Sequence, residues 1–130
     1  MHQRASFGGD RRLLKHADFQ RVYKQGRRHF ATHVTVFYLL RPSAEQPRVG
    51  FAVGRVLGGA VERNRIKRRL REAVRLHFPA QLTADLVIHP RKSVLTAEFS
   101  TLTTELERAF ATVRTALARA GGESKDAAKA

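Results

Sequence analysis

The residues from Arg63 to Arg71 are the part of the sequence best suited to chemistry with a partner. Six of these nine positions are Lys or Arg, and Ile66 and Leu70 lie among them. Guanidinium and ammonium groups at this density bind phosphate oxygens through charge-assisted hydrogen bonds. The whole chain has the same bias, with 25 Lys and Arg against 11 Asp and Glu and a formal charge of +14. Such a surplus repels itself until a polyanion neutralises it, so the sequence predicts a polyanionic partner.

At about 100° per residue, residues 62–77 form a helix with two different faces. The apolar face, which predicts contact with a core, consists of Ile66, Leu70, Ala73, Val74 and His77. The opposite, cationic face consists of Asn64, Arg68, Arg71 and Arg75, with Arg65 and Lys67 at its margins. Like charges four residues apart destabilise an isolated helix by about a few tenths of a kcal/mol per pair. This cost favours a face that binds nucleic acid over a merely solvated face, in which Glu would alternate with Lys.

The sequence contains no recognisable catalytic group. The chain has no cysteine, which excludes disulfides, thiolate nucleophiles and Cys-ligated zinc. His29 and His33 fall in a strand pattern, where their imidazoles are too far apart to bind one metal ion. The Gly-rich run "GRVLGG" lacks the GK[ST] ending of a phosphate-binding P-loop. We therefore expect no metal or cofactor bound by the protein itself, and an autonomous nuclease lacks residues to perform the reaction.

A helix and a strand region are predicted ahead of the basic segment. Phe19 and Tyr23 recur at helical spacing in a helix that begins near His16, and Gly26 is placed to end it in a left-handed cap. The next residues alternate between apolar and polar types, as one strand or as two strands joined by a bend near Ala31. Within this alternation one face consists of Val34, Val36, Tyr38 and Leu40, and the other of His33, Thr35 and Phe37.

Two further strands are predicted on either side of the basic helix. The run "RVGFAVG", residues 48–54, puts Gly50, Ala52 and Gly54 on one face, which is therefore almost bare. "ADLVIHP" is a short strand after the basic helix, and apolar residues at helical spacing over residues 96–120 predict a closing helix.

Length and hydropathy indicate one domain in the cytoplasm. A chain of 130 residues is long enough for one core and too short for two. No apolar run approaches the roughly 20 residues that span a bilayer, and residues 1–12 lack the apolar centre of a secretory signal. We expect a flexible basic N-terminus over residues 1–10, a folded domain over residues 11–120 and a flexible tail over residues 121–130, with no membrane partner.

Nucleic acid is the polyanion that these features favour, and RNA is favoured over DNA. A helix that reads the major groove needs a helix-turn-helix or a zipper beside it, whereas a strand and "GRVLGGAV" precede the basic helix here. The excess of Arg over Lys suits bidentate phosphate contacts, although a GC-rich genome explains it equally well.

The string Arg63-Asn64-Arg65, which continues as "IKRRLREA", resembles the signature of bacterial ribonuclease P protein subunits. Members of this family assist a catalytic RNA in removing the 5′ leader of precursor tRNA. The segments "LLKHADFQRVYKQGRR", "RVGFAVG", "ADLVIHPR" and "TTELERAFATVRTAL" are similar to the family's other helices and strands, in the right order. Val56 and Gly59 depart from the family, which commonly has basic or polar residues there.

The resemblance implies an α+β fold, a two-layer α/β sandwich in the order αβββαβα. It is similar to the second domain of a small-subunit ribosomal protein, and it has a left-handed crossover around the basic helix. Ordinary chirality favours right-handed parallel crossovers, so the left hand follows from the resemblance alone.

Two RNA-binding surfaces are also implied by the resemblance. The catalytic RNA would lie against Arg55, Arg63, Asn64, Arg65, Lys67, Arg68, Arg71 and Arg75. The 5′ leader would lie in a cleft between the first helix and the sheet, against Phe19, Tyr23, Phe37 and Ala52, with Arg12 and Arg91 at its rim. Aromatic rings stack on bases of any sequence, which suits a leader without fixed sequence. From periodicity alone, Phe19 and Tyr23 would be ordinary core residues.

The function implied is that of a ribonuclease P protein subunit with catalytic RNA and precursor tRNA as partners. The RNA would carry out catalysis and would require Mg2+, and one or more protein copies would bind each RNA. The alternative is a structural RNA-binding protein of the ribosome, which would share the charge, the size and the basic helix. That alternative gives no reason to keep Phe37 exposed over a floor of Gly and Ala.

Overall fold

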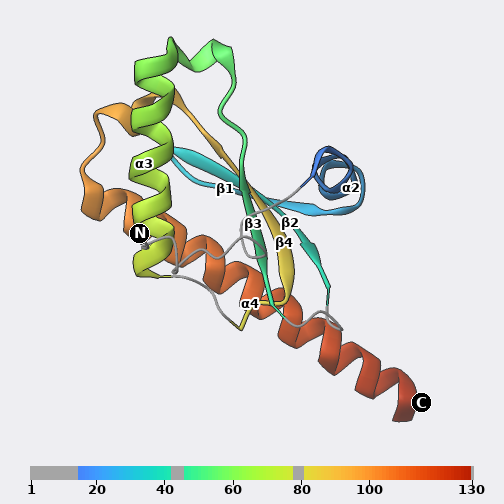
Figure 1. Ribbon diagram of the computed structural model, residues 1–130. Coiled ribbons are helices and arrows are strands. Elements are labelled where there is room, and N and C mark those ends of the chain that lie inside the picture. The colour runs from blue at the N-terminus through green and yellow to red at the C-terminus, as the bar shows by residue number, and fades with distance from the viewer. Residues whose placement is uncertain (1–14, 42–45, 78–80, 130) are drawn as a thin grey trace.

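The computed structural model describes residues 15–41, 46–77 and 81–129, with side chains as far as Ala120 (Figure 1). The described helices and strands are α2 (His16–Gln25), β1 (Arg27–Phe30), β2 (Val34–Leu40), β3 (Arg48–Phe51), α3 (Ala60–Leu76), β4 (Ala84–Pro90) and α4 (Phe99–Lys129). Two short 3-10 turns, η2 (Arg55–Leu57) and η3 (Lys92–Leu95), precede α3 and α4. The predicted order αβββαβα is confirmed, and the run that alternates around Ala31 forms two strands joined by a bend.

The four strands form one mixed sheet in the order β1-β2-β4-β3. The β1–β2 and β2–β4 pairs are antiparallel, and β3 and β4 pair in parallel. Because parallel neighbours need a crossover connection, α3 provides the link between β3 and β4. Figure 1 shows α2 and α3 on opposite sides of the sheet, with α4 running across the same side as α3. The left hand of the crossover stays a prediction from the resemblance.

The main core lies between the sheet and the layer of α3 and α4. Ile66, Leu70 and Val74 of α3 are fully buried, as the helical wheel predicts. The other large side chains of this core include Val34, Val36, Tyr38, Val49, Leu86, Ile88, Leu102, Leu106, Phe110 and Val113. The predicted apolar face of the basic helix is therefore confirmed, and the cationic face points away from the core.

Gly26 ends α2 in a conformation that differs from the prediction. Its φ of −89° and ψ of −174° are extended, so the left-handed cap predicted at this position is wrong. A Cβ atom at Gly26 would lie 2.5 Å from the carbonyl oxygen of Tyr38 and 2.6 Å from that of Val22. Glycine is required here because the end of the helix meets strand β2 at a distance that excludes any side chain.

Helix α4 extends beyond the folded domain predicted from the sequence. It runs to Lys129, so its last nine residues lie in the segment predicted as a flexible tail. Flexibility of that tail stays a prediction, and the predicted N-terminal segment 1–10 lies outside the described residues. None of the helices in the described ranges is both long enough and apolar enough to cross a membrane.

Candidate RNA-binding surfaces

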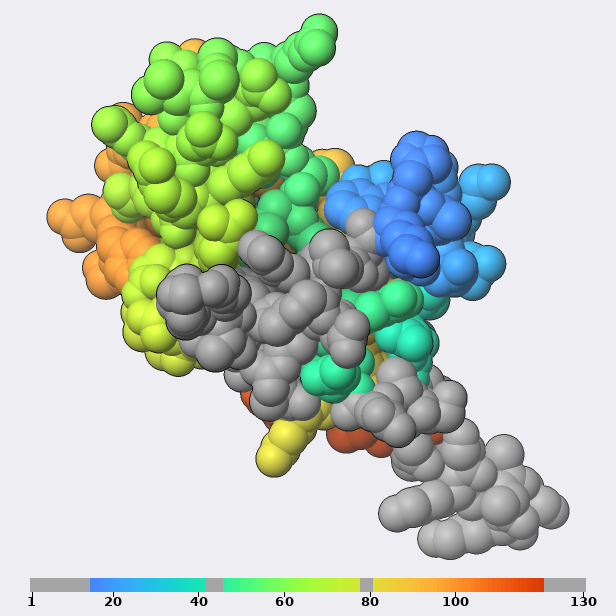
Figure 2. All heavy atoms as spheres, in the orientation of Figure 1, coloured from blue at the N-terminus to red at the C-terminus, as the bar shows by residue number. Residues whose placement is uncertain are grey.

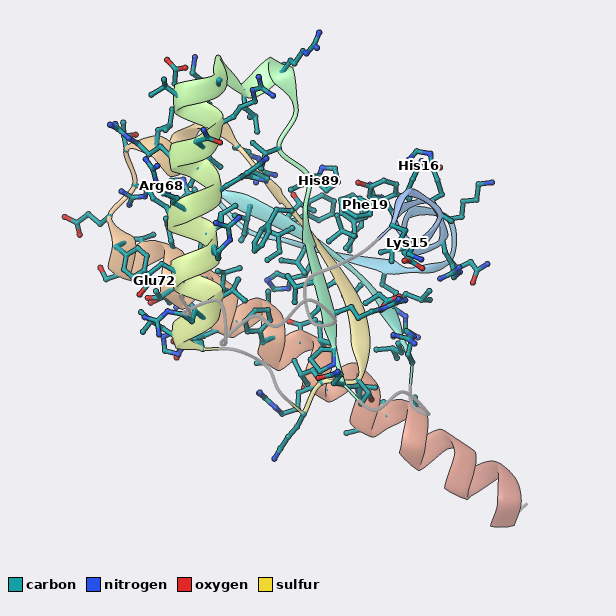
Figure 3. The ribbon with its side chains drawn as sticks, in the orientation of Figure 1. Lys15, His16, Phe19, Arg68, Glu72 and His89 are labelled. Carbon is teal, nitrogen blue, oxygen red and sulfur yellow. The ribbon has the colours of Figure 1, made fainter. Side chains whose placement is uncertain are left out.

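The sheet face opposite the main core packs against α2, and this region, where the cleft was predicted, is called the cleft below. Side chains alternate along each strand, so this face carries Phe37 of β2 and His89 of β4. The register places Phe37 beside Val87, and Val87 beside Gly50 of β3. Figure 3 shows Phe19 and His89 between α2 and the sheet. The strand alternation thus brings residues from three separate segments to one side.

Phe19, Tyr23, Phe37 and His89 form an aromatic cluster in this cleft. Tyr23 meets Phe37 edge-on, with ring centroids 5.2 Å apart and an interplanar angle of 78°. Phe19 and Tyr23 are 6.4 Å apart, and Phe37 and His89 are 4.8 Å apart. All four side chains are half-buried rather than enclosed. The structure therefore brings together the three aromatic residues predicted for the cleft, and none of them belongs to the main core.

His89 is a member of the cluster that sequence reasoning missed. Nε2 of His89 and the phenol oxygen of Tyr23 share a hydrogen bond of 2.7 Å, in which the tautomer of the imidazole decides the donor. Burial lowers the pKa of His89 and raises the pKa of Tyr23, so both groups are neutral at neutral pH. The signal was present in the strand "ADLVIHP", where alternation places His89 on the same face as Val87.

Two arginines border the aromatic cluster. Arg91 donates hydrogen bonds to the carbonyl oxygen of Ala31 at 2.9 Å and to Oγ1 of Thr35 at 3.1 Å, which places its guanidinium at the end of the cleft. The guanidinium carbon of Arg28, on β1, lies 6.0 Å from the centroid of Phe37. Arg28 was not predicted, because its position follows from its pairing opposite Phe37 across β1 and β2. The predicted rim residue Arg12 lies outside the described residues.

The floor of the cleft is less open than the sequence predicts. Phe37 is half-buried, and both Gly50 and Val87 are buried, so no bare floor lies beneath its ring. The open part begins at Ala52, the predicted cleft residue on the neighbouring strand. There a groove of about 420 Å³ runs past His89, lined by Ala52, Val53, Gly54, Val56, Leu57, His89 and Pro90. The bare strand face therefore produces a groove at the end of β3 rather than under Phe37.

An ion network links α2 to the sheet beside the aromatic cluster. The fully buried carboxylate of Asp85 on β4 accepts hydrogen bonds from Arg48 at 2.8 and 2.9 Å and from Arg41 at 2.9 Å. Arg48 also reaches Asp18 of α2, at 3.4 Å. The backbone N–H of Lys15, followed by the nearby arginines, lowers the pKa of Asp18. Arg48 thus connects three elements that are distant in sequence.

The second surface is the cationic face of α3. Figure 2 shows α3 at the molecular surface on the side away from α2. The predicted contact residues Arg55, Asn64, Arg65, Arg68 and Arg75 are exposed, and Arg63, Lys67 and Arg71 are half-buried. Glu62 at the start of the helix accepts a hydrogen bond from the backbone N–H of Gly59 at 3.0 Å, which caps the helix. The structure therefore places all eight predicted residues on η2 and α3.

These cations differ in how far they are neutralised within the protein. Arg75 is paired with Glu72, and Arg63 donates a hydrogen bond to the carbonyl oxygen of Gly58 at 3.2 Å. Arg65 and Arg68 form no ion pair or hydrogen bond with any residue in the described ranges. The side chains of Arg55 and Lys67 likewise have no such partner in these ranges, but Arg65 and Arg68 are the two exposed cations of α3 that are left unpaired, which makes them good candidates to bind phosphate oxygens.

The described residues include no group of three or more His, Asp or Glu side chains arranged to hold a metal ion. The carboxylates that approach one another, Asp18 and Asp85, are occupied by arginine.

Comparison with known proteins identifies the family to which the chain is related. The sequence pattern of the family Ribonuclease P matches residues 7–114. A ribonuclease P protein component from Symbiobacterium thermophilum is 46% identical over 101 residues, which cover 76% of this chain and 87% of the relative. Another, from Clostridioides difficile, is 36% identical over 95 residues, which cover 72% of this chain and 82% of the relative.

Solved structures give the same result for the fold. The RNase P protein of Staphylococcus aureus is 32% identical with a TM-score of 0.65, and the alignment covers 75% of this chain and 89% of that one. The RNase P protein of Thermotoga maritima is 27% identical with a TM-score of 0.67, covering 76% and 94%. These matches give no support to the alternative of a ribosomal protein. The resemblance seen in the sequence is confirmed, and the chain belongs to the ribonuclease P protein family.

Proposed function

We propose that the chain is the protein subunit of ribonuclease P and acts with a catalytic RNA to remove the 5′ leader of precursor tRNA. The observation that carries this proposal is that two different surfaces, one aromatic and one cationic, lie on opposite faces of the sheet. A cleft with aromatic rings and arginines lies on one face of the sheet, and a cationic helix lies on the other. A protein that only neutralises a folded RNA needs the second surface and has no use for the first.

The cationic face of α3 is the proposed contact with the catalytic RNA. Arg65 and Arg68 project from the same exposed side of a helix whose opposite side is locked into the core by Ile66 and Leu70. Because the helix is already fixed to the core, its cations bind a folded RNA backbone with little loss of main-chain freedom in the protein. Catalysis belongs to the RNA in this proposal, and the Mg2+ that the reaction needs is bound by the RNA.

The aromatic cleft is the proposed contact with the leader. Half-buried rings can stack on bases, a contact worth about 1 to 3 kcal/mol per base, and it does not depend on base identity. Arg28 and Arg91 lie beside the rings, where they would neutralise the phosphates of the strand. We infer that the subunit works in the cytoplasm, with one or more copies on each RNA.

Reconstitution tests the proposed function. Purified protein is added to the ribonuclease P RNA of the same organism at low Mg2+, and cleavage of a precursor tRNA is followed. Stimulation is expected, because the cations of α3 replace part of the screening that Mg2+ provides. The double variant Arg65→Ala/Arg68→Ala should require more protein for the same stimulation. Absence of stimulation by the unaltered protein would contradict the proposal.

A second measurement tests the assignment of the cleft. Equilibrium titrations compare the holoenzyme's affinity for precursor tRNA and for mature tRNA, which has no leader. Phe37→Ala should weaken binding of the precursor by about 1 to 3 kcal/mol and leave binding of mature tRNA unchanged. An equal loss for both RNAs in a folded variant would show that Phe37 does not contact the leader.

A further inference from the structure

Phe30 is an exposed aromatic residue that the aromatic cluster does not include. Its side chain is 63% exposed, although it lies in the regular strand β1. In the register, Phe30 pairs with Thr35 and Thr35 pairs with His89, so Phe30 stands on the cleft face of the sheet. Burial of a Phe side chain normally stabilises a protein by about 1.5 to 3 kcal/mol. Because Phe30 is mostly exposed, its ring contributes little of this stabilisation.

The two arginines that border the aromatic cluster, Arg28 and Arg91, also lie near Phe30. The guanidinium carbon of Arg28 lies 5.2 Å from the centroid of Phe30 and 6.0 Å from that of Phe37, so one cation serves both rings. The guanidinium of Arg91 is fixed next to the end of β1, because it donates hydrogen bonds to the carbonyl oxygen of Ala31 and to Oγ1 of Thr35. Phe30 and Phe37 are thus consecutive aromatic positions along one strip of the surface, with an arginine between them.

Open space lies next to Phe30. A hollow of about 570 Å³ is bounded by the edge strand β1, by the bend that follows it and by the first turns of α4, so it lies around the edge of the sheet from the cleft. Besides Phe30, its lining includes the hydroxyl side chains of Ser100 and Thr104, the guanidinium of Arg108 and the carboxylate of Glu105, which accepts a hydrogen bond from the backbone N–H of His33 at 2.9 Å. A hollow with an aromatic ring, hydroxyl groups and a cation offers contacts to a base, a ribose and a phosphate.

We propose that Phe30 and this hollow form an additional binding site for one nucleotide of single-stranded RNA, which extends the cleft beyond Phe37. The inference rests on the proposed function, since the strand that reaches Phe30 is the same leader that lies in the cleft. Arg28 joins the two sites because its guanidinium contacts both rings. A second copy of this chain is an unfavourable occupant, because each copy has a formal charge of +14.

An abasic scan of the leader tests the site in the reconstituted holoenzyme. Precursor tRNAs that each lack one leader base are titrated against the unaltered protein, Phe37→Ala and Phe30→Ala. In the unaltered complex, removal of the base that stacks on Phe30 should weaken binding by about 5-fold or more. In Phe30→Ala the same removal should have no further effect. The position concerned should be adjacent to, and different from, the position that depends on Phe37.

Three controls separate the possible explanations. Phe30→Tyr keeps the ring and should restore the base dependence that Phe30→Ala removes. Leu76→Ala shortens another exposed apolar side chain, at the far end of α3, and should leave the scan unchanged. Binding of the protein to the catalytic RNA alone, and its oligomeric state, should be the same for Phe30→Ala and for the unaltered protein.

The outcomes distinguish this inference from the function on which it rests. If neither Phe37→Ala nor Phe30→Ala alters any leader dependence, the leader does not use the cleft and both proposals are overturned. If Phe37→Ala removes a base dependence and Phe30→Ala removes none, the additional site alone is overturned. If Phe30→Ala instead weakens binding of the catalytic RNA or dissociates a protein dimer, Phe30 has a different occupant and the inference is likewise wrong.

Discussion

Replacement of Arg48 by Met should loosen α2 and open the cleft. The guanidinium of Arg48 donates two hydrogen bonds to the buried carboxylate of Asp85 and also reaches Asp18 on α2. Arg48→Met leaves Asp85 with Arg41 as its remaining partner and removes the link between β4 and α2. Met keeps much of the apolar volume of the side chain, so the change mainly removes charge and hydrogen bonds.

The size of the effect follows from the burial of the partners. Loss of one partner from a fully buried ion pair costs about 3 to 5 kcal/mol. Here the side chain of Arg48 is 25% exposed and Asp85 keeps one donor, so we expect about 2 to 4 kcal/mol. Arg21→Met is the matched control, because it also removes an arginine from Asp18. Its side chain is 44% exposed, and a pair of that kind contributes about 0 to 1 kcal/mol.

Urea unfolding of the isolated protein measures both free energies. Titration of the holoenzyme with precursor and with mature tRNA then shows whether the cleft has changed. Arg48→Met should weaken leader-dependent binding, whereas Arg21→Met should not. If the two variants unfold at the same urea concentration, the network is an ordinary surface feature and the docking of α2 has another cause. If Arg48→Met is destabilised but binds the leader normally, α2 does not set the geometry of the cleft.

Three further predictions concern the core, the cationic face and pH. Leu70→Ala should lower the free energy of unfolding by about 2 to 5 kcal/mol through the cavity that it leaves, whereas Arg68→Ala, at an exposed position, should lower it little. If urea unfolding shows the reverse order, the buried and exposed faces of α3 have been assigned the wrong way round. Arg65→Ala/Arg68→Ala should make binding of the catalytic RNA less steeply dependent on salt, because fewer counterions are released, and equal slopes in titrations over a range of salt would contradict phosphate contact. Because the pKa of Asp18 is lowered in the folded state, its contribution to stability is complete above the ordinary value of 3.8 and is lost as pH falls through the lowered value. Asp18→Asn should therefore lose less stability than the unaltered protein as the pH falls below 3.8, in unfolding curves recorded at each pH.

Local periodicity was sufficient to predict the elements and their faces. The spacing of Ile66, Leu70 and Val74 fixes which side of α3 is buried, because that spacing depends only on the helix repeat. Alternation likewise placed Phe37 on the face opposite to Val36 and Tyr38. These predictions need no knowledge of which strand lies beside which.

The features that the sequence did not predict all depend on contacts between distant segments. Gly26 was interpreted as a left-handed cap, but glycine is needed there because the carbonyl oxygen of Tyr38 on β2 lies too close for any side chain. Arg48 and Asp85 are 37 positions apart, and no local pattern indicates that they pair. Arg28 and His89 join the cleft through the strand register, which was unknown before the order β1-β2-β4-β3 was seen.

In the proposed function, the sheet allows one small domain to bind two RNAs. Along β2 and β4, residues that face the main core alternate with residues that face the cleft, as Ile88 and His89 do. The cationic helix is anchored on the first set and the leader, in the proposed arrangement, on the second. In that arrangement the catalytic RNA and the leader would occupy opposite sides of the same strands and would not compete for side chains. Because strand spacing in a paired sheet is nearly fixed, their separation is set by the fold, and a change in the core beneath α3 would disturb both surfaces together.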